Sequence, residues 1–483
     1  MASRPACCPG DVPVTTLGHE PVQASSVPSA PLLPGRRPAR RRTELGLIIL
    51  AAALTGGLYA LAGAGRAGSL PANIIPFLIV ILVLLLVGHI AMRILAPEAD
   101  PVLLPVAGLL NGVGYVFIAR LSTAEASAQA LWSTLGMAAF VITLVVVRRA
   151  RDLARYRYTW GALGFLLLLL PLVPGLGEDI NGARLWIHLG SHEFQPGQLA
   201  ELVLAVFFAA ALIERAEQLS RGTRRLGRML IVDPKYLAPV LLAWGLSLLI
   251  FLAENDLGSS FLFFAMFLGM LWIATGRGSY LLLGGGLFLG GSSFALTAIG
   301  HAKLRVQGWL HPFAHPDTSG YQILQGLFAI ANGGLFGTGP GESNAAVIPY
   351  ASSDMIFAVV AEEIGLAGVT ALLAGYLLLV GTGMRIALRC EDPFEKLLAA
   401  GLSLIIGIQT FVIVGGVTRL IPLTGITLPF VAYGGSSLIT FYILLALLVR
   451  ISDTTARQGF PVLLAGSQRV RAGANEALAR DSQ

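Results

Sequence analysis

Apolar runs of about 20 residues, separated by short polar segments, recur along the chain from residue 45 to residue 450. A run of this length crosses the hydrocarbon core of a bilayer as one α-helix. We therefore predict an all-α, polytopic membrane protein with about twelve transmembrane helices. The predicted spans are 45–65, 73–95, 101–121, 128–148, 158–174, 198–214, 236–253, 257–275, 279–300, 354–386, 395–418 and 428–450.

The composition agrees with this prediction and excludes a soluble protein. The chain of 483 residues is 55% hydrophobic and 12% charged, with a mean hydropathy of +0.75, whereas soluble domains are roughly 25% charged. The net charge of +6 arises from basic residues in short loops beside the spans, so it indicates membrane topology rather than nucleic-acid binding. Cys7, Cys8 and Cys390 have the spacing of neither a zinc site nor a disulfide framework.

The organisation along the chain is a membrane domain between two tails. Residues 1–43 are rich in proline, serine and alanine and contain an arginine cluster, so we expect a disordered, basic cytoplasmic tail. The flanks do not suit a cleaved signal peptide, and the first span is therefore predicted to be an uncleaved anchor. The transmembrane domain covers 44–452, and 453–483 is predicted to be a second cytoplasmic tail.

The basic residues also predict which loops face the cytoplasm. Loops 148–157, 214–228 and 385–396 are basic, whereas 175–197, 301–353 and 419–427 hold few basic residues. By the positive-inside rule, the first set and both termini are cytoplasmic, and the second set lies outside. The longest outer loop is 301–353.

Ionisable side chains within or beside membrane spans are costly, so each is a functional hypothesis. On a continuous helix, Asp354 and Glu362 would share one face about two turns apart. The alternative is structural: Ser352, Ser353 or Asp354 caps a helix, and Glu362 or Glu363 pairs with a neighbouring helix. The full set is Glu178, Asp179, Arg184, His188, Glu201, Glu254, Asp256, Asp354, Glu362 and Glu363.

The outer loop 301–353 combines the parts needed to hold a diphosphate and activate a hydroxyl group. Arginine binds phosphate, a carboxylate or an imidazole accepts a proton, and glycine lets backbone N–H groups approach an anion. Its length and polarity also fit a simple connector. The loop contains Lys303, Arg305, His311, His315, Asp317, Tyr321 and the glycine-rich run "NGGLFGTGPG".

Five long motifs lie along the membrane domain: "INGARLWIHLGSHEFQPGQLAEL" (180–202), "ENDLGSS" (254–260), "GYQILQGLFAIANGGLFGTGPG" (320–341), "DMIFAVVAEEIGLAG" (354–368) and "IPLTGITLPFVAYGGSS" (421–437). Together they resemble the signatures of the SEDS proteins, the RodA, FtsW and SpoVE polymerases of the bacterial cell wall. The resemblance spans about 100–452, is closest to the long actinobacterial members, and marks 44–452 as a SEDS-like domain.

This resemblance implies a peptidoglycan glycosyltransferase in the bacterial plasma membrane that serves cell elongation and shape or cell division. It would polymerise lipid II, an undecaprenyl diphosphate-linked glycan, at the outer face, next to a class B penicillin-binding transpeptidase. A carboxylate would assist deprotonation or hold a divalent cation, Mg²⁺ or Mn²⁺, and no organic cofactor is implied. Apolar grooves between helices would take the polyprenyl tails, and membrane lipids would be a further partner.

The resemblance carries over to individual residues with one important departure. Relatives place a catalytic aspartate before the "GYQ" motif, where this chain has His315, and Asp317 follows two residues later. We therefore predict Asp317 or His315 as the catalytic residue; the metal ligands are unknown. The predicted substrate-binding residues are Arg184, Lys303, Arg305, Tyr321, Gln322, Asp354, Glu362 and Asp256, of which Arg184, Asp256, Asp354 and Glu362 match the family pattern.

Further departures keep other functions open. Gln198 and Glu201 stand where relatives usually have glutamate and lysine, Ser352 and Ser353 replace a usual His-Thr pair, and Ala432 replaces a serine. One alternative is a non-catalytic paralogue that recruits a transpeptidase as a scaffold. The other is a transporter of lipid-linked precursors, which the charges within the spans suggest.

Overall fold

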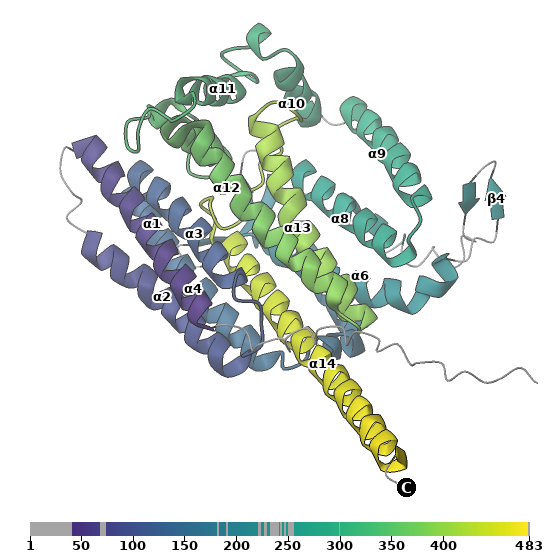
Figure 1. Cartoon of the computed structure of the whole chain (residues 1–483). Helices are drawn as coiled ribbons and strands as arrows, with labels where there is room; N and C mark the ends of the chain where they lie inside the picture. Colours follow the sequence, from purple (N-terminus) through teal and green to yellow (C-terminus); the bar gives the residue numbers. More distant parts are fainter. Residues whose placement is uncertain are drawn as a thin grey trace, which may run out of the picture. The chain divides into compact units, whose positions relative to one another are not determined.

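The computed structural model (Figure 1) is a bundle of long helices. It describes residues 41–67, 74–180, 183–189, 192–220, 224–226, 229–231, 241, 244–245, 248–249, 256–298 and 300–481. The predicted tail 1–43 and the predicted span 236–253 lie almost wholly outside these residues.

Nine helices of the described residues are long and apolar enough to cross a membrane, which confirms the predicted multi-span, all-α class. They are α1 (Arg41–Ala67), α2 (Ile74–Leu95), α3 (Leu103–Leu121), α4 (Thr123–Val146), α6 (Pro196–Ser220), α8 (Leu257–Thr275), α12 (Ile356–Arg389), α13 (Pro393–Val417) and α14 (Gly435–Asp481).

One predicted span is shorter than expected. The prediction 158–174 corresponds to α5 (Arg157–Leu169), which gives way to the 3₁₀ turn η2 (Leu170–Leu172). Pro171 explains the early end, because proline cannot continue the hydrogen-bond ladder of an α-helix. The prediction 279–300 corresponds closely to α9 (Ser279–Ala298).

Local sequence signals set several helix ends. α8 begins after Asp256, whose carboxylate accepts a hydrogen bond from the Ser259 amide at 2.9 Å, and it ends at Gly276 with φ +67°. α13 begins in the same way, because Asp392 accepts from the Glu395 amide at 3.0 Å. Such caps satisfy amide groups that have no partner within the helix. α14 does not stop at residue 452 but continues as one helix to Asp481.

The segment predicted as the outer loop 301–353 contains two α-helices and two 3₁₀ turns. It contains α10 (Gly300–Leu310), the 3₁₀ turn η3 (Pro312–Ala314), α11 (Tyr321–Gly333) and η4 (Ala345–Val347). The remaining elements are η1 (Ala150–Tyr156), a three-stranded antiparallel sheet of β1 (Gly177–Ile180), β2 (Ala183–Leu189) and β3 (His192–Phe194), and the hairpin of β4 (Arg224–Leu226) and β5 (Met229–Ile231).

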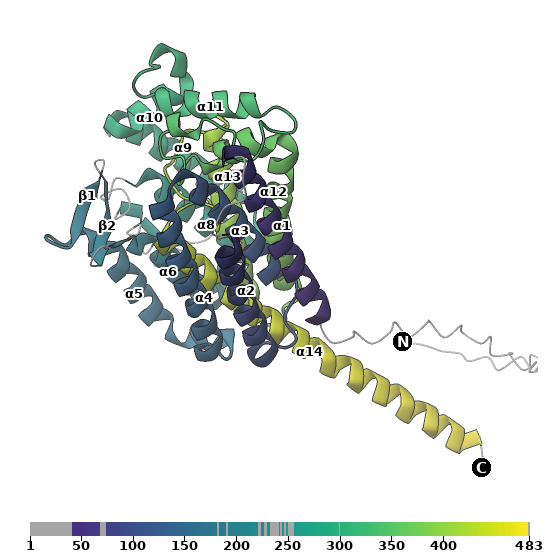
Figure 2. The same cartoon turned by 90° about the vertical axis from the view of Figure 1, so that its left-hand side faces the viewer.

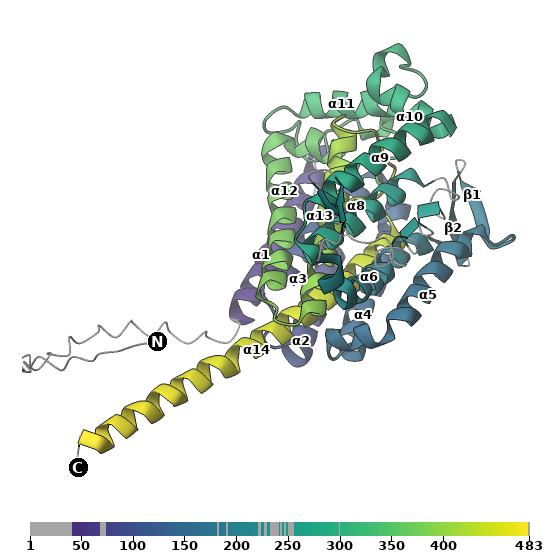
Figure 3. The same cartoon turned by 90° about the vertical axis from the view of Figure 1, so that its right-hand side faces the viewer.

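One end of the bundle gathers the predicted cytoplasmic loops. The Arg450 guanidinium in α14 donates to the carbonyl oxygens of Leu95 at 2.6 Å and Val147 at 2.7 Å, where α2 and α4 end. At the same end, Asp453 accepts from the Glu98 amide at 2.8 Å. α14 leaves the bundle here, whereas α10 and α11 lie at the opposite end, as Figures 2 and 3 show.

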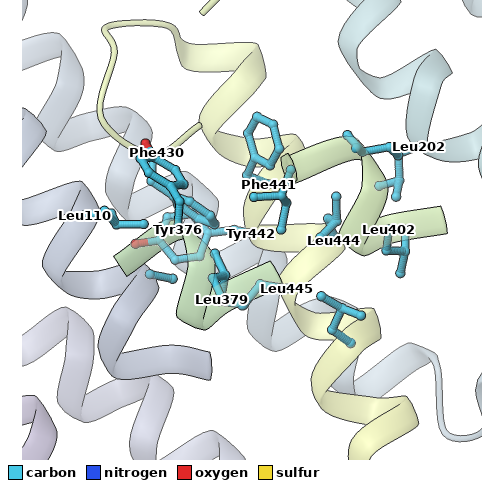
Figure 4. Packing of buried hydrophobic residues seen from close by; sticks show 14 of the residues in the cluster. Leu110, Leu202, Tyr376, Leu379, Leu402, Phe430, Phe441, Tyr442, Leu444 and Leu445 are labelled. Carbon is cyan, nitrogen blue, oxygen red and sulfur yellow. The ribbon is translucent and has the colours of Figure 1, made fainter. Parts of the chain in front are cut away.

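The core lies where α14 packs against α4, α6, α12 and α13. The Phe430 ring, from the α13–α14 connection, meets the edge of Tyr442 with ring centres 5.6 Å apart. The buried Tyr376 hydroxyl of α12 donates to the Pro429 carbonyl oxygen at 2.6 Å. Figure 4 shows these rings packed among leucines of α12 and α14. This packing fixes the α13–α14 connection, which carries part of the candidate site.

α12 is broken at Gly365, where the backbone adopts φ 64° and ψ −170°. Residues 334–339 fill the break: the amides of Thr338 and Gly339 donate to the carbonyl oxygens of Glu362 and Glu363 at 2.9 and 3.1 Å. In return, the amides of Leu366 and Ala367 donate to the carbonyl oxygens of Gly334 and Leu335, each at 3.0 Å. Four backbone groups beside the break therefore have partners in residues 334–339, as a broken membrane helix requires.

Candidate functional site

Four segments far apart in the sequence converge at the end of the bundle that holds α10. The Arg305 guanidinium of α10 donates to the Thr424 carbonyl oxygen at 2.8 Å. Asp354, just before α12, lies next to Gly425. The start of α8 packs on the same connection, since a β-carbon at Gly258 would lie 2.8 Å from the Thr424 carbonyl oxygen. We call Arg305, Asp354, Asp256, Thr424 and Gly425 the Arg305 cluster.

Asp256 is a buried member of the cluster and the residue that caps α8. Burial raises the pKa of its carboxyl group, while the hydrogen bonds from Ser259 and the positive charge of Arg305 oppose that rise. Sequence reasoning chose Asp256 because it stands beside a span, and the structure places it within the electrostatic reach of Arg305.

Asp354 is the second carboxyl group of the cluster. Burial raises its pKa to about 6, the negative charge of Asp256 adds to the rise, and the charge of Arg305 opposes it. Asp354 precedes α12, whose N-cap is Met355 and has no side-chain hydrogen bond. The expectation that Ser352, Ser353 or Asp354 caps this helix is therefore wrong, as is the shared helical face of Asp354 and Glu362.

Glu201 of α6 is a neighbour of the cluster that the predicted site did not include. Its buried carboxylate lies close enough to Asp256 for the two charges to repel, and it hydrogen bonds to the Ser259 side chain. Its Oε1 atom has no partner among the described residues. The sequence signal was a carboxylate inside an apolar span, which is costly unless it has a role.

His315 and Asp317, the predicted catalytic residues, lie in a tight turn between η3 and α11. The His315 carbonyl oxygen accepts from the amides of Thr318 and Gly320 at 3.3 and 3.0 Å. Both side chains are exposed. Within the described part of the chain, neither forms a hydrogen bond or ion pair with the Arg305 cluster, so their catalytic role stays a prediction.

The other predicted substrate-binding residues are dispersed. Lys303 and Arg184 are exposed, the latter on β2. The Tyr321 hydroxyl donates to the Val347 carbonyl oxygen at 3.4 Å. The buried Gln322 Nε2 and Glu362 Oε2 atoms lack hydrogen-bond partners among the described residues. No hydrogen bond or ion pair in that part of the chain joins these five side chains to the Arg305 cluster.

The remaining ionisable candidates that the structure describes either form a structural ion pair or belong to β-strands. Glu363 forms a buried ion pair with Arg120 of α3 and accepts hydrogen bonds from the Gly341 amide at 2.7 Å and the Ser343 hydroxyl at 2.8 Å. The expected pairing with a neighbouring helix is thus confirmed for Glu363. Glu178 and Asp179 belong to β1 and His188 to β2. Glu254 lies outside the described residues.

The part of the chain that the structure describes contains no preformed metal-binding site built from protein side chains. No group of three or more histidine, cysteine, aspartate or glutamate side chains there is arranged to hold one. The carboxylates of the Arg305 cluster do not fit a protein-only site, because Mg²⁺ requires near-ideal octahedral oxygen geometry. The divalent cation expected from the sequence therefore stays a prediction.

Comparison with sequence families and curated proteins gives long, consistent matches. The model of the "Cell cycle protein" family of FtsW, RodA and SpoVE matches residues 102–457. The chain is 41% identical over 449 residues to the peptidoglycan glycosyltransferase RodA of Mycobacterium tuberculosis, covering 89% of this chain and 96% of that protein. It is 34% identical over 351 residues to the probable peptidoglycan glycosyltransferase FtsW of Geobacter metallireducens, covering 72% and 87%.

Solved structures agree with these matches. One similar chain, with TM-score 0.60 and 26% identity, comes from work on the coordination of polymerization and crosslinking by a peptidoglycan synthase complex; the match covers 74% of this chain and 98% of that one. Another is a mutant of the Rod shape determining protein RodA of Thermus thermophilus, with TM-score 0.52 and 27% identity, covering 73% and 97%. The family match begins at residue 102, after α1 and α2.

Proposed function

This chain belongs to the FtsW, RodA and SpoVE family of cell cycle proteins, and we propose that it is a peptidoglycan glycosyltransferase that polymerises lipid II. Its membership rests on the family match over 102–457. The names of its curated relatives support the activity. The observation in the structure that supports a reaction centre is the Arg305 cluster, in which a cation stands beside two carboxyl groups.

The cluster supplies the two functions that glycosyl transfer needs. The acceptor hydroxyl oxygen attacks the anomeric carbon of the donor, the bond to the diphosphate breaks, and the diphosphate leaves with the bonding electrons. Asp354 takes the hydroxyl proton, since a carboxylate with a pKa of about 6 is mostly ionised at neutral pH and remains a competent base. Arg305, which is exposed, binds the departing diphosphate.

Asp256 and Glu201 act through their negative charges on the neighbouring groups of the cluster rather than on the substrate. Asp256 lies within electrostatic reach of both Arg305 and Asp354. Its negative charge favours the protonated form of Asp354 and so strengthens that group as a base. The exposed His315 and Asp317 remain the alternative bases, on the loop that leads into α11.

The orientation of the chain follows from its charges. The bundle end that holds Arg450 also carries η1 and the start of α13, with the basic segments 148–157 and 385–396. This end faces the cytoplasm in our proposal, with both termini. The Arg305 cluster then faces the outside of the plasma membrane, where lipid II is polymerised.

A transpeptidase is the proposed partner. The similar solved chain comes from a synthase complex in which polymerization and crosslinking are coordinated. Crosslinking acts on the glycan that polymerisation produces, so a class B penicillin-binding protein held beside the Arg305 cluster would receive the new strand directly.

Polymerisation of lipid II by the purified full-length chain with its transpeptidase tests the proposal. The wild type should form glycan strands that separate on a gel. Arg305→Gln should lose most of this activity, whereas Lys303→Gln, which changes an exposed cation on the same helix, should keep it. If the wild type forms no glycan under conditions in which mycobacterial RodA is active, that result contradicts the enzyme assignment and favours the scaffold function.

A further inference from the structure

A cavity of about 190 Å³ lies between α2, α3, α4 and α14, apart from the Arg305 cluster. Five residues of α2 line one side: Pro76, Val80, Ile81, Leu84 and Leu85. The opposite walls are Gly108, Asn111, Gly112 and Tyr115 of α3, Ala130 and Ser133 of α4, and Tyr442 of α14. None of these lining residues, among those that the structure describes, carries a charge.

The polar atoms in the wall already satisfy one another. The Asn111 amide nitrogen donates to the Ser133 hydroxyl oxygen at 3.2 Å and to the Tyr442 hydroxyl oxygen at 3.1 Å. A polar headgroup would therefore find neither a counter-charge nor a free hydrogen-bond group at these side chains. An apolar molecule fits better, because cavities with apolar walls stay dry and take up apolar ligands.

The cavity depends on a helix that lies outside the matched family region. α2 (Ile74–Leu95) precedes residue 102, where the family match begins. Its outward side is exposed and apolar, with Ile79, Val83 and Ile90 about half exposed, as expected of a helix in contact with lipid. The cavity thus joins a lipid-facing helix to the family domain, within the membrane-spanning part of all four helices.

We propose that this cavity is a binding site for a hydrocarbon chain of a membrane phospholipid. A phospholipid suits it better than the polyprenyl tail of the substrate, because no residue of the Arg305 cluster, where the diphosphate is proposed to bind, lines the cavity. Most of the lining residues of α2 belong to its first half. In the proposed orientation, this half lies in the outer leaflet, so an outer-leaflet chain occupies the site.

α3 offers a direct readout of occupancy. None of its residues, from Leu103 to Leu121, is more than partly exposed, so little of α3 is open to lipid along the protein surface and the cavity gives a lipid chain access to its wall. The test uses the full-length protein in liposomes that contain a phospholipid with a diazirine in its acyl chain. After irradiation, mass spectrometry of peptides gives the labelling of α3, and a parallel sample uses a photoreactive polyprenyl diphosphate.

Filling the cavity provides the matched comparison. Ala130→Phe places a ring in the cavity, whereas Ala138→Phe places the same ring two turns along α4 at an exposed position. We expect the phospholipid probe to label α3 in the wild type and in Ala138→Phe. Labelling in Ala130→Phe should fall about tenfold, which corresponds to about 1.4 kcal/mol of binding free energy. Val80→Phe fills the site from α2 if Ala130→Phe reduces the folded fraction.

Three results would overturn the proposal. The first is an α3 helix unlabelled by the phospholipid probe in the wild type. The second is equal labelling in the Ala130→Phe and Ala138→Phe variants. The third is labelling by the polyprenyl probe alone, which assigns the cavity to the substrate tail instead. None of them bears on polymerisation of lipid II, which is measured separately.

Discussion

Arg305 and Asp354 approach the same point beside Gly425: a β-carbon on that glycine would lie 3.6 Å from Nη2 of Arg305 and 3.7 Å from Oδ2 of Asp354. Gly425 also has φ +78°, in the left-handed region that glycine adopts readily. The Arg305 guanidinium and the Asp354 carboxyl group therefore both lie close to the backbone of the α13–α14 connection at a position without a side chain.

Gly425→Ala should impair catalysis more than folding. The left-handed conformation costs a non-glycine residue about 1–2 kcal/mol, and the added methyl group would displace Arg305 or Asp354. A displacement near 1 Å can cost about 100-fold in rate. Gly276→Ala is the control, since Gly276 has φ +67° and open space around it. Equal polymerisation rates for the two variants, after correction for the folded fraction, would show that the Gly425 position does not matter.

The pH dependence should report the carboxyl group of Asp354. Because its pKa is about 6 and the ionised form is the base, the polymerisation rate should fall about tenfold per pH unit below pH 6. Asp256→Asn removes a negative neighbour, lowers the pKa of Asp354 and should move the midpoint to lower pH. Asparagine still caps α8. Rate profiles measured with the wild type and with Asp256→Asn check the shift. An unmoved midpoint would show that the group titrating in the rate profile is not Asp354.

Gly365→Ala should destabilise the fold, because the break in α12 has no room for a side chain. Its β-carbon would lie 2.2 Å from the Gly337 amide nitrogen, and its φ is +64°. The conformation alone costs about 1–3 kcal/mol. Gly381→Ala, in the same helix with nothing within 4 Å, should be neutral or stabilising. Thermal unfolding in detergent compares them, and equal melting temperatures would refute the close packing of residues 334–339 on α12.

The buried Arg120–Glu363 pair should behave as a structural unit. Removal of one partner by Arg120→Met leaves an unpaired buried charge and should cost about 3–5 kcal/mol of unfolding free energy. The double variant Arg120→Met, Glu363→Met should recover part of that loss. A double-mutant cycle in denaturant measures the coupling, and strictly additive losses would mean that the pair contributes no mutual stabilisation.

The sequence predicted the helical class because hydrophobic runs report membrane spans directly. It failed where tertiary contacts decide the backbone. The run around Gly365 contains no proline and was expected to form a continuous helix, yet residues 334–339 provide partners that make a break possible. α11 was hidden in a polar outer segment, although Ile323, Leu324 and Ala329 are buried on one side of it.

The sequence predicted the charged residues of the candidate site but not how they are arranged in space. Asp256 and Asp354 drew attention because ionisable groups near spans are costly, and Arg305 because arginine binds phosphate. Thr424 and Gly425 did not draw attention. Thr424 contributes only its backbone carbonyl oxygen, and Gly425 contributes only the space left by its lack of a side chain. Glu201 was noted as a carboxylate in a span, but its proximity to Asp256 depends on the packing of α6 against α8.

We attribute the chemistry to the Arg305 cluster, and to Asp354 in particular. The most direct test is the rate of lipid II polymerisation by Asp354→Asn, compared with His315→Ala and Asp317→Ala at equal amounts of folded protein. We expect Asp354→Asn to lose at least about 100-fold, as removal of a general base does, while the two loop variants stay close to the wild type. A near-normal rate for Asp354→Asn, with a loss in His315→Ala or Asp317→Ala, would contradict the account.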